Sequence, residues 1–144
     1  MASAAHFGLT TADGRRPRVA IVCGNPASAM VTIMLCEQFG CAPYAAASGE
    51  AVLALLRRDD VDLVMLDLAM TDMDAIAVAQ LIRTLGTRGA MPIVALAEKA
   101  SDLSEARARA GGFAETVVKP YSPRELYGAM QSALERPSAA VGIR

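Results

Sequence analysis

Short apolar runs alternate along the chain with longer segments of helical periodicity. Five of these runs have the length of a β-strand and cover residues 19–23, 44–47, 62–67, 92–97 and 116–119. The runs are apolar rather than alternately apolar and polar, which is typical of strands buried on both faces of a parallel sheet. The run at 62–67 is the strongest, because four apolar residues stand between Asp62 and Asp67.

The segment after the first run predicts a helix. It begins at Asn25-Pro26, which is a helix start signal, and continues to about Phe39. We expect this helix to turn one apolar face toward the core. The residues spaced for that face are Ala27, Met30, Val31, Met34 and Leu35.

Four further helices are predicted after the other strands. Ser48 caps the second, and the third follows a loop over residues 68–74. The fourth begins near Ser101 or Asp102 and stops at residues 111–112, Gly-Gly. The fifth begins with the capping box Ser-Pro-Arg-Glu at 122–125, with proline at the first helical position, and Pro137 ends it. These units predict an α/β fold, with a doubly wound, five-stranded parallel sheet and five helices in three α/β/α layers.

In sheets of this kind, ligands bind at the carboxyl ends of the strands. The residues that follow the predicted strands are therefore the candidates for a functional site. They are Cys23 and Gly24, Asp67, Ala97 and Glu98, and Lys119 and Pro120.

Length and composition narrow the possibilities. At 144 residues, 53% of them hydrophobic, the chain fits one domain with a filled core. A formal net charge of −1 and scattered arginines exclude the basic surface of a nucleic-acid-binding protein. No apolar run approaches the roughly 20 residues of a membrane span. The first residues also lack the charged segment followed by an apolar segment that marks a secretory signal. We therefore expect a cytoplasmic protein with no membrane partner, in which residues 1–16 are a flexible lead, 17–136 the domain and 137–144 a short flexible tail.

Three cysteines are an odd number and stand at no metal-ligand spacing. We expect Cys36 and Cys41 to be buried, because a free cysteine packs as a small hydrophobic residue. Cys23 differs from them because it ends a predicted strand.

Asp67 and Lys119 are the charged residues that stand out. A carboxylate is rarely buried without a partner, and Asp67 directly follows four apolar residues of the predicted central strand. Lys119 ends the fifth strand, so we expect the two side chains to form an ion pair over the sheet edge. Such a pair is balanced in charge and has no electrostatic need for a metal ion.

Three segments resemble the receiver domain of two-component response regulators: VDLVMLDLAMTDMDA, MPIVALAEKA and GGFAETVVKPYSPREL. The resemblance covers about residues 17–136 and implies a flavodoxin-like fold. It also implies that Asp67 is the aspartate phosphorylated by a histidine kinase and that Lys119 contacts the phosphoryl group. Residues 70–75 match the family's Met-Pro-x-Met-Asp-Gly loop, with Thr71 in place of the proline and Ala75 in place of the glycine.

The sequence departs from the family pattern at four further positions. Cys23 and Gly24 stand where the family has a pair of acids that holds magnesium. Ala97 replaces the Thr or Ser that binds a phosphoryl oxygen, and Thr116 replaces an aromatic switch residue. Magnesium takes oxygen ligands, whereas a thiol is soft and glycine has no side chain. With only Asp67 and the backbone carbonyl of Ala69 left, we expect no cofactor, and weak or absent magnesium binding.

The main hypothesis is an atypical, pseudo-receiver-like, stand-alone member of the family that works in phosphorelay signalling. It is not expected to be an enzyme, and phosphorylation of Asp67 should be weak or noncanonical, and slow or absent with small phosphodonors, because phosphoryl transfer depends on neutralising the transferred charge. The alternative is a docking module that acts without phosphate, and in either case the partner is a sensor histidine kinase or another signalling protein, with a docking face at Ser101 to Glu135. A third hypothesis is a redox sensor in which Lys119 lowers the pKa of Cys23.

Overall fold

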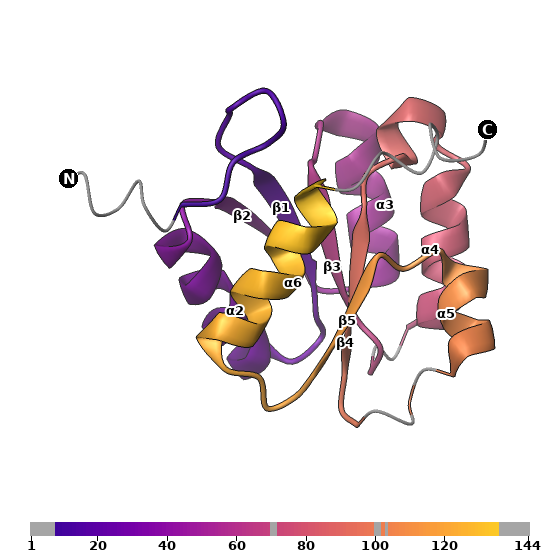
Figure 1. The fold of residues 1–144 in the computed structure, drawn as a ribbon. Helices are drawn as coiled ribbons and strands as arrows, with labels where there is room; N and C mark the ends of the chain where they lie inside the picture. The colour runs from indigo at the N-terminus through magenta and orange to yellow at the C-terminus, as the bar shows by residue number, and fades with distance from the viewer. Residues whose placement is uncertain (1–7, 70–71, 100–101, 103, 136–144) are drawn as a thin grey trace.

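The fold is a five-stranded parallel sheet between two layers of helices. The computed structural model describes residues 8–69, 72–99, 102 and 104–135 (Figure 1). The strands lie in the order β2-β1-β3-β4-β5, which confirms the predicted flavodoxin-like arrangement. Their bounds are Arg18–Val22 (β1), Ala42–Ala46 (β2), Leu63–Asp67 (β3), Ile93–Ala97 (β4) and Glu115–Val118 (β5).

Five α-helices and one short 3-10 helix cover the sheet in the described part of the chain. They are α2 (Pro26–Gln38), α3 (Gly49–Arg58), α4 (Ala75–Arg83), η1 (Gly86–Gly89), α5 (Glu105–Gly111) and α6 (Pro123–Glu135). Helices α2 and α6 cover one face, and α3, α4 and α5 lie on the other side (Figure 1). None of these helices is long and apolar enough to span a lipid bilayer.

The central strands lie in the middle of the core. Every residue of β3 and β4 is buried, because helices cover both faces of the sheet. Successive residues of β3 point to opposite faces: Leu66 packs in the α3–α4 layer and Met65 in the α2–α6 layer. Helices thus pack against both faces of the sheet at the end of β3, where Asp67 follows Leu66.

Helix α2 does not bury the face that its sequence predicts. Met30, Val31 and Met34 are 58%, 55% and 51% exposed, while Thr32 and Cys36 are buried. The prediction is wrong because α2 is apolar nearly all round, with Glu37 as its one charged residue. The periodicity of apolar residues therefore could not choose between two faces.

The fourth predicted helix begins later than expected. Helix α5 starts at Glu105 and is capped by the Ser104 hydroxyl, which accepts the backbone N–H of Arg107 at 3.2 Å. Asp102 instead accepts the backbone N–H groups of Glu98 and Lys99, at 2.9 and 3.0 Å. Its carboxylate closes a turn after β4, so it does not begin the helix, while Ser101 lies outside the described residues.

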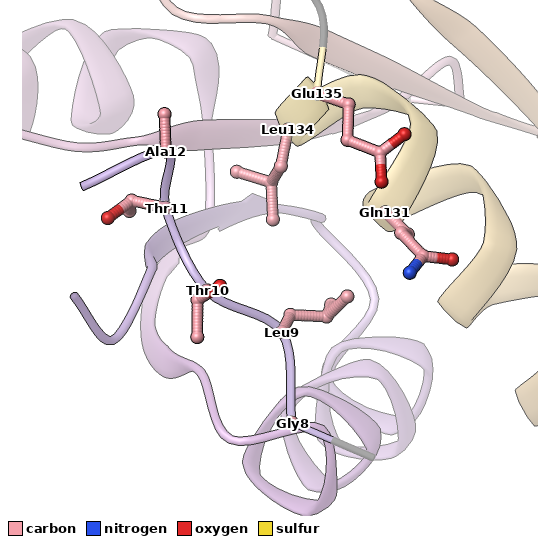
Figure 2. Close-up of a pocket in the computed structure, with 8 residues that line it drawn as sticks. All are labelled: Gly8, Leu9, Thr10, Thr11, Ala12, Gln131, Leu134 and Glu135. Carbon is pink, nitrogen blue, oxygen red and sulfur yellow. The ribbon is translucent and has the colours of Figure 1, made fainter. Parts of the chain in front are cut away.

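The lead before β1 packs on the domain from residue 8. Leu9 is buried in the α2–α6 layer, and its N–H donates to the carbonyl of Phe39 at 2.7 Å. The sequence pattern places residues 8–16 outside the domain, because a single leucine among polar residues has no periodicity. A pocket of about 540 Å³ lies between this lead and the end of α6 (Figure 2). It is lined by Gly8, Leu9, Thr10, Thr11, Ala12, Gln131, Leu134 and Glu135.

Candidate functional site

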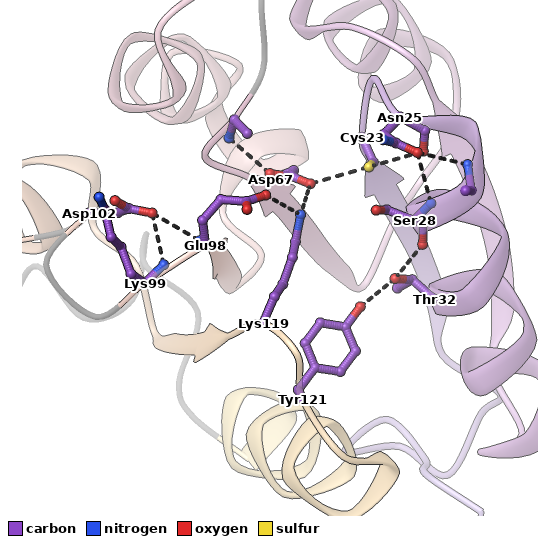
Figure 3. Close-up of polar contacts among 12 residues, drawn as sticks. Cys23, Asn25, Ser28, Thr32, Asp67, Glu98, Lys99, Asp102, Lys119 and Tyr121 are labelled. Carbon is purple, nitrogen blue, oxygen red and sulfur yellow. Dashed lines mark hydrogen bonds and ion pairs between the residues drawn. The ribbon is translucent and has the colours of Figure 1, made fainter.

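The end of β3 places one carboxylate at the carboxyl edge of the sheet. Asp67 is 3% exposed. Its Oδ1 accepts a hydrogen bond from the backbone N–H of Ala69 at 2.8 Å, and its Oδ2 accepts one from the ammonium of Lys119 at 2.6 Å. The thiol of Cys23 lies 3.2 Å from the same Oδ2 (Figure 3). The charge of this buried acid is thus met by donors from three different segments, as a buried carboxylate requires.

Lys119 reaches Asp67 from the end of β5, as the sequence predicts. Its backbone N–H donates to the carbonyl of Ala97 at 2.8 Å, which extends the β4–β5 pairing to the site. Burial by itself lowers the pKa of Lys119, but the hydrogen bond and charge of Asp67, together with Glu98, outweigh it and raise that pKa. Lys119 is therefore a cation at neutral pH.

A second carboxylate shares this lysine. Glu98 Oε2 lies 3.4 Å from Lys119 Nζ, and the Glu98 side chain is 62% exposed, against 4% for Asp67. The sequence predicts a neutral pair of Asp67 and Lys119, but this prediction leaves out the Glu98 carboxylate. With Glu98 included, the three side chains carry a net charge of −1. Position alone marked Glu98 as a candidate, since it follows β4, but nothing in the sequence indicated that it reaches Lys119.

Cys23 is a protonated thiol in this site. It is buried, and burial raises the pKa of its thiol, as does the neighbouring Asp67 carboxylate. The charge of Lys119 does act to lower this pKa, but its influence is smaller than that of desolvation, so the expectation of a lowered thiol pKa is wrong. Cys36 and Cys41 are buried as expected, and burial raises the pKa of Cys41 to about 11.

The other substituted positions lie where the topology predicts. Gly24 follows β1 and is exposed; a Cβ there would meet only the carbonyl oxygen of Ala47, at 3.7 Å. Ala97 is fully buried at the end of β4, and Thr116 is exposed on β5. Position 24 thus has room for a larger side chain.

A hydrogen bond that the sequence did not indicate joins α2 to the loop after β5. The hydroxyl oxygens of Thr32 and Tyr121 lie 2.6 Å apart, and the Thr32 hydroxyl also lies 3.1 Å from the carbonyl of Ser28 (Figure 3). Burial raises the pKa of Tyr121, so its phenol is protonated. The two residues are 89 positions apart, and no local pattern pairs them.

The loop between β3 and α4 is tied to both of its neighbours. Asp72 accepts the backbone N–H of Gly49 at 3.1 Å, at the start of α3. Asp74 caps α4 by accepting the N–H of Ala77 at 3.2 Å and pairs with Arg107 at 3.2 Å. The residues that match the second half of the family's loop are thus held in place, while residues 70–71 lie outside the described part of the chain.

The residues of the site do not fit a magnesium ion. Within the described residues, no group of three His, Cys, Asp or Glu side chains is arranged to hold a metal. Cys23 supplies a soft sulfur, which is a poor ligand for a hard cation, and Gly24 supplies no side chain, so Asp67 has no neighbouring acid at the end of β1.

This fold and this edge define the class of the protein. A parallel sheet in the order 2-1-3-4-5, with an acid and a lysine meeting at its carboxyl edge, is a flavodoxin-like fold rather than a barrel or a classic dinucleotide-binding sheet. The response regulator receiver domain family matches residues 19–131, and the chain belongs to that family. The resemblance in the sequence is thereby confirmed.

Curated relatives are longer than this chain. It is 28% identical over 124 residues to the transcriptional regulatory protein BaeR of Escherichia coli, covering 86% of this chain and 50% of BaeR. It is 30% identical over 125 residues to the DNA-binding response regulator MtrA of Mycolicibacterium smegmatis, covering 86% and 53%. The chain thus spans about half the length of these relatives.

Solved structures share the fold. The chemotaxis response regulator CheY4 of Vibrio cholerae aligns with a TM-score of 0.76 at 21% identity, covering 82% of this chain and 98% of that one. The receiver domain of a sensor histidine kinase from Pseudomonas aeruginosa PAO1 aligns with a TM-score of 0.77 at 20% identity, covering 84% and 99%. That structure has a magnesium ion coordinated in its active site cleft.

Proposed function

We propose that this chain is a receiver module of two-component signalling in which Asp67 accepts a phosphoryl group slowly and without a resident magnesium ion. A histidine kinase is the proposed donor. The observation that carries this proposal is the set of protein donors around Asp67. Lys119, Cys23 and the N–H of Ala69 offset the charge of Asp67, and Cys23 and Gly24 supply no oxygen ligand that would hold a metal beside it.

The chemistry of the step explains why it is slow. An oxygen of Asp67 attacks the phosphorus, the bond to the donor nitrogen breaks, and the donor imidazole leaves with the electron pair. Catalysis of this step consists mostly of positioning and of neutralising charge on the transferred group. Among the described residues, Lys119 is the cation that contacts Asp67 and can neutralise charge on the transferred group. Ala97 has no hydroxyl that could donate to a phosphoryl oxygen.

The test is the intact mass of the protein after incubation with acetyl phosphate or phosphoramidate, with and without magnesium. We expect a small phosphorylated fraction that does not grow with magnesium and that Asp67→Asn removes. The exposed acid variant Asp59→Asn, at the end of α3, serves as the control and should behave as wild type. A rapid adduct that depends on magnesium would contradict the proposal, and so would the absence of any adduct.

Docking without phosphate is the second candidate function. The observation that favours it is the exposed apolar surface of α2, called here the α2 face: Ala27, Met30, Val31 and Met34. The expected docking face at 101–135 has less to offer, since Val118 is its one exposed large hydrophobic residue in the described part of the chain. Exposed apolar patches of this kind often mark interaction sites.

Affinity capture separates the two functions. If docking does not depend on phosphorylation of Asp67, wild type and Asp67→Asn capture the same proteins. The double variant Met30→Ser/Met34→Ser then fails to capture them. If phosphorylation controls docking, Asp67→Asn alone changes the captured set.

A further inference from the structure

Lys119 stands between a buried carboxylate and an exposed one. Its ammonium lies 2.6 Å from Asp67 Oδ2 and 3.4 Å from Glu98 Oε2. Asp67 approaches from the sheet, while Glu98 approaches from the loop after β4 (Figure 3). Because Glu98 is 62% exposed, its carboxylate lies on the solvent side of the lysine.

The loop that carries Glu98 is fixed at its base. The backbone N–H of Glu98 donates to Asp102 at 2.9 Å, and that of Lys99 donates to the same carboxylate oxygen at 3.0 Å. The turn begins directly after β4, whose last residue, Ala97, is fully buried. The backbone of Glu98 is therefore held by hydrogen bonding to Asp102, directly after the buried end of β4.

We infer that Glu98 is an internal competitor for Lys119 and determines how strongly the site attracts phosphate-like anions. The inference rests on the proposed function, in which Lys119 contacts the phosphoryl group on Asp67. A phosphoryl oxygen approaching from solvent meets a lysine that Glu98 already contacts. It must displace this carboxylate or share the cation with it.

The charges before and after transfer show the direction of the effect. Asp67, Glu98 and Lys119 sum to −1 before the reaction. Transfer converts the Asp67 carboxylate into an acyl phosphate whose phosphoryl group carries two negative charges, so the sum becomes −2. Without the Glu98 charge, the corresponding sums are 0 and −1. Glu98 thus opposes both the approach of the anion and its retention, and its influence is moderated by exposure to solvent.

The experiment is a titration with inorganic phosphate followed by heteronuclear NMR. It compares wild type, Glu98→Gln and the matched control Glu37→Gln, which removes another exposed charge, at the far end of α2. Phosphate should shift the backbone amides of Ala97 and Lys119. Its affinity for Glu98→Gln should be about fivefold higher than for the other two proteins, as expected for removing one screened charge.

Each outcome of the titration bears on the inference. Equal affinities in the three proteins, including no detectable binding by any, would overturn it. A gain that Glu37→Gln reproduces, or shifts confined to other surfaces, would overturn it as well. The titration requires no phosphoryl transfer, so failure of Asp67 to become phosphorylated would refute the proposed function, while the phosphate affinities would still decide the role of Glu98.

Discussion

The ammonium of Lys119 lies 2.6 Å from the carboxylate of Asp67, although the two residues are 52 positions apart. Asp67 is the last residue of β3, Lys119 directly follows β5, and β4 lies between these strands. The side chain of Lys119 therefore crosses the end of β4 to reach Asp67. The contact has two effects. It gives the buried carboxylate of Asp67 a cationic partner, and it keeps the ammonium at the carboxyl edge of the sheet, where a phosphate-like anion would bind.

Removal of Lys119 should destabilise the domain more than removal of the Asp67 charge. Lys119→Met leaves the buried carboxylate with the thiol of Cys23 and the N–H of Ala69, at a cost of about 3 kcal/mol. Asp67→Asn should cost about 1 kcal/mol, because Lys119 keeps Glu98 and partial access to water. Urea unfolding at pH 7 measures both, and equal losses would contradict the asymmetry.

The pH dependence of this pair has a definite sign. The pKa of Lys119 is raised above its ordinary 10.5, so the folded state holds this proton more tightly than the unfolded chain. The contribution to stability is complete below pH 10.5 and is lost as the pH rises through the folded-state pKa. Wild type should lose more stability than Lys119→Met as the pH rises above 10.5 in urea titrations. Parallel losses would show that the lysine pKa is not raised.

Cys23 should be unreactive at neutral pH. Its pKa is raised above the ordinary 9.0, so the thiol stays protonated at about pH 8 and is a weak nucleophile. Alkylation by iodoacetamide, located by peptide mapping, should accelerate only above about pH 9. Cys23→Ser identifies the peptide concerned, and rapid modification at neutral pH would revive the redox hypothesis.

The Thr32–Tyr121 hydrogen bond should contribute about 1 kcal/mol to stability. Thr32→Val and Tyr121→Phe should each lose about this amount in urea unfolding. The double variant should lose less than the sum of the two, because one shared interaction is removed. Strict additivity would mean that the hydroxyl groups do not interact in solution.

Substitutions on the α2 face should leave stability unchanged. Met30→Ser and Met34→Ser remove side chains that are more than half exposed, so each should change the free energy of unfolding by less than about 0.5 kcal/mol. Cys36→Ser, which places a hydroxyl in the core beneath the same helix, should cost about 1–3 kcal/mol, as other buried polar substitutions do. If the two methionine variants unfold as easily as Cys36→Ser, the burial assigned to α2 is incorrect.

The strands could be predicted because buried parallel strands are apolar along their length, whereas the flavodoxin-like arrangement came from the resemblance to receiver domains. Asp67 and Lys119 could be paired from the sequence, since each ends such a strand and the carboxyl ends share one edge. The buried face of α2 could not be predicted, because its apolar residues surround the helix. Leu9 was missed for the opposite reason, since a lone apolar residue forms no pattern.

Side-chain reach limited the prediction of the site. Glu98 follows β4, but whether its long side chain turns toward Lys119 or toward solvent depends on the turn closed by Asp102. The pKa of Cys23 depends on how desolvation compares with the charge of Lys119, and spacing in the sequence does not measure that balance. Thr32 and Tyr121 meet only because α2 and the loop after β5 lie next to each other in the fold.

We propose that magnesium is not held beside Asp67 because Cys23 and Gly24 stand where this family has a pair of acids. The most direct test is the rate of Asp67 phosphorylation by acetyl phosphate, measured by intact mass as magnesium is titrated. The experiment compares wild type with the double variant Cys23→Asp/Gly24→Asp and with a triple variant that also carries Ala97→Thr. Position 24 has room for the new side chain. The double variant is included because it leaves the buried Ala97 unchanged.

We predict that magnesium leaves the wild-type rate unchanged and raises the rate of the acid-restored proteins about tenfold or more, because two added carboxylates supply the oxygen ligands and negative charge that a hard cation requires. A wild-type rate that rises with magnesium to the same extent, or acid-restored proteins that fold and show no gain, would contradict the claim.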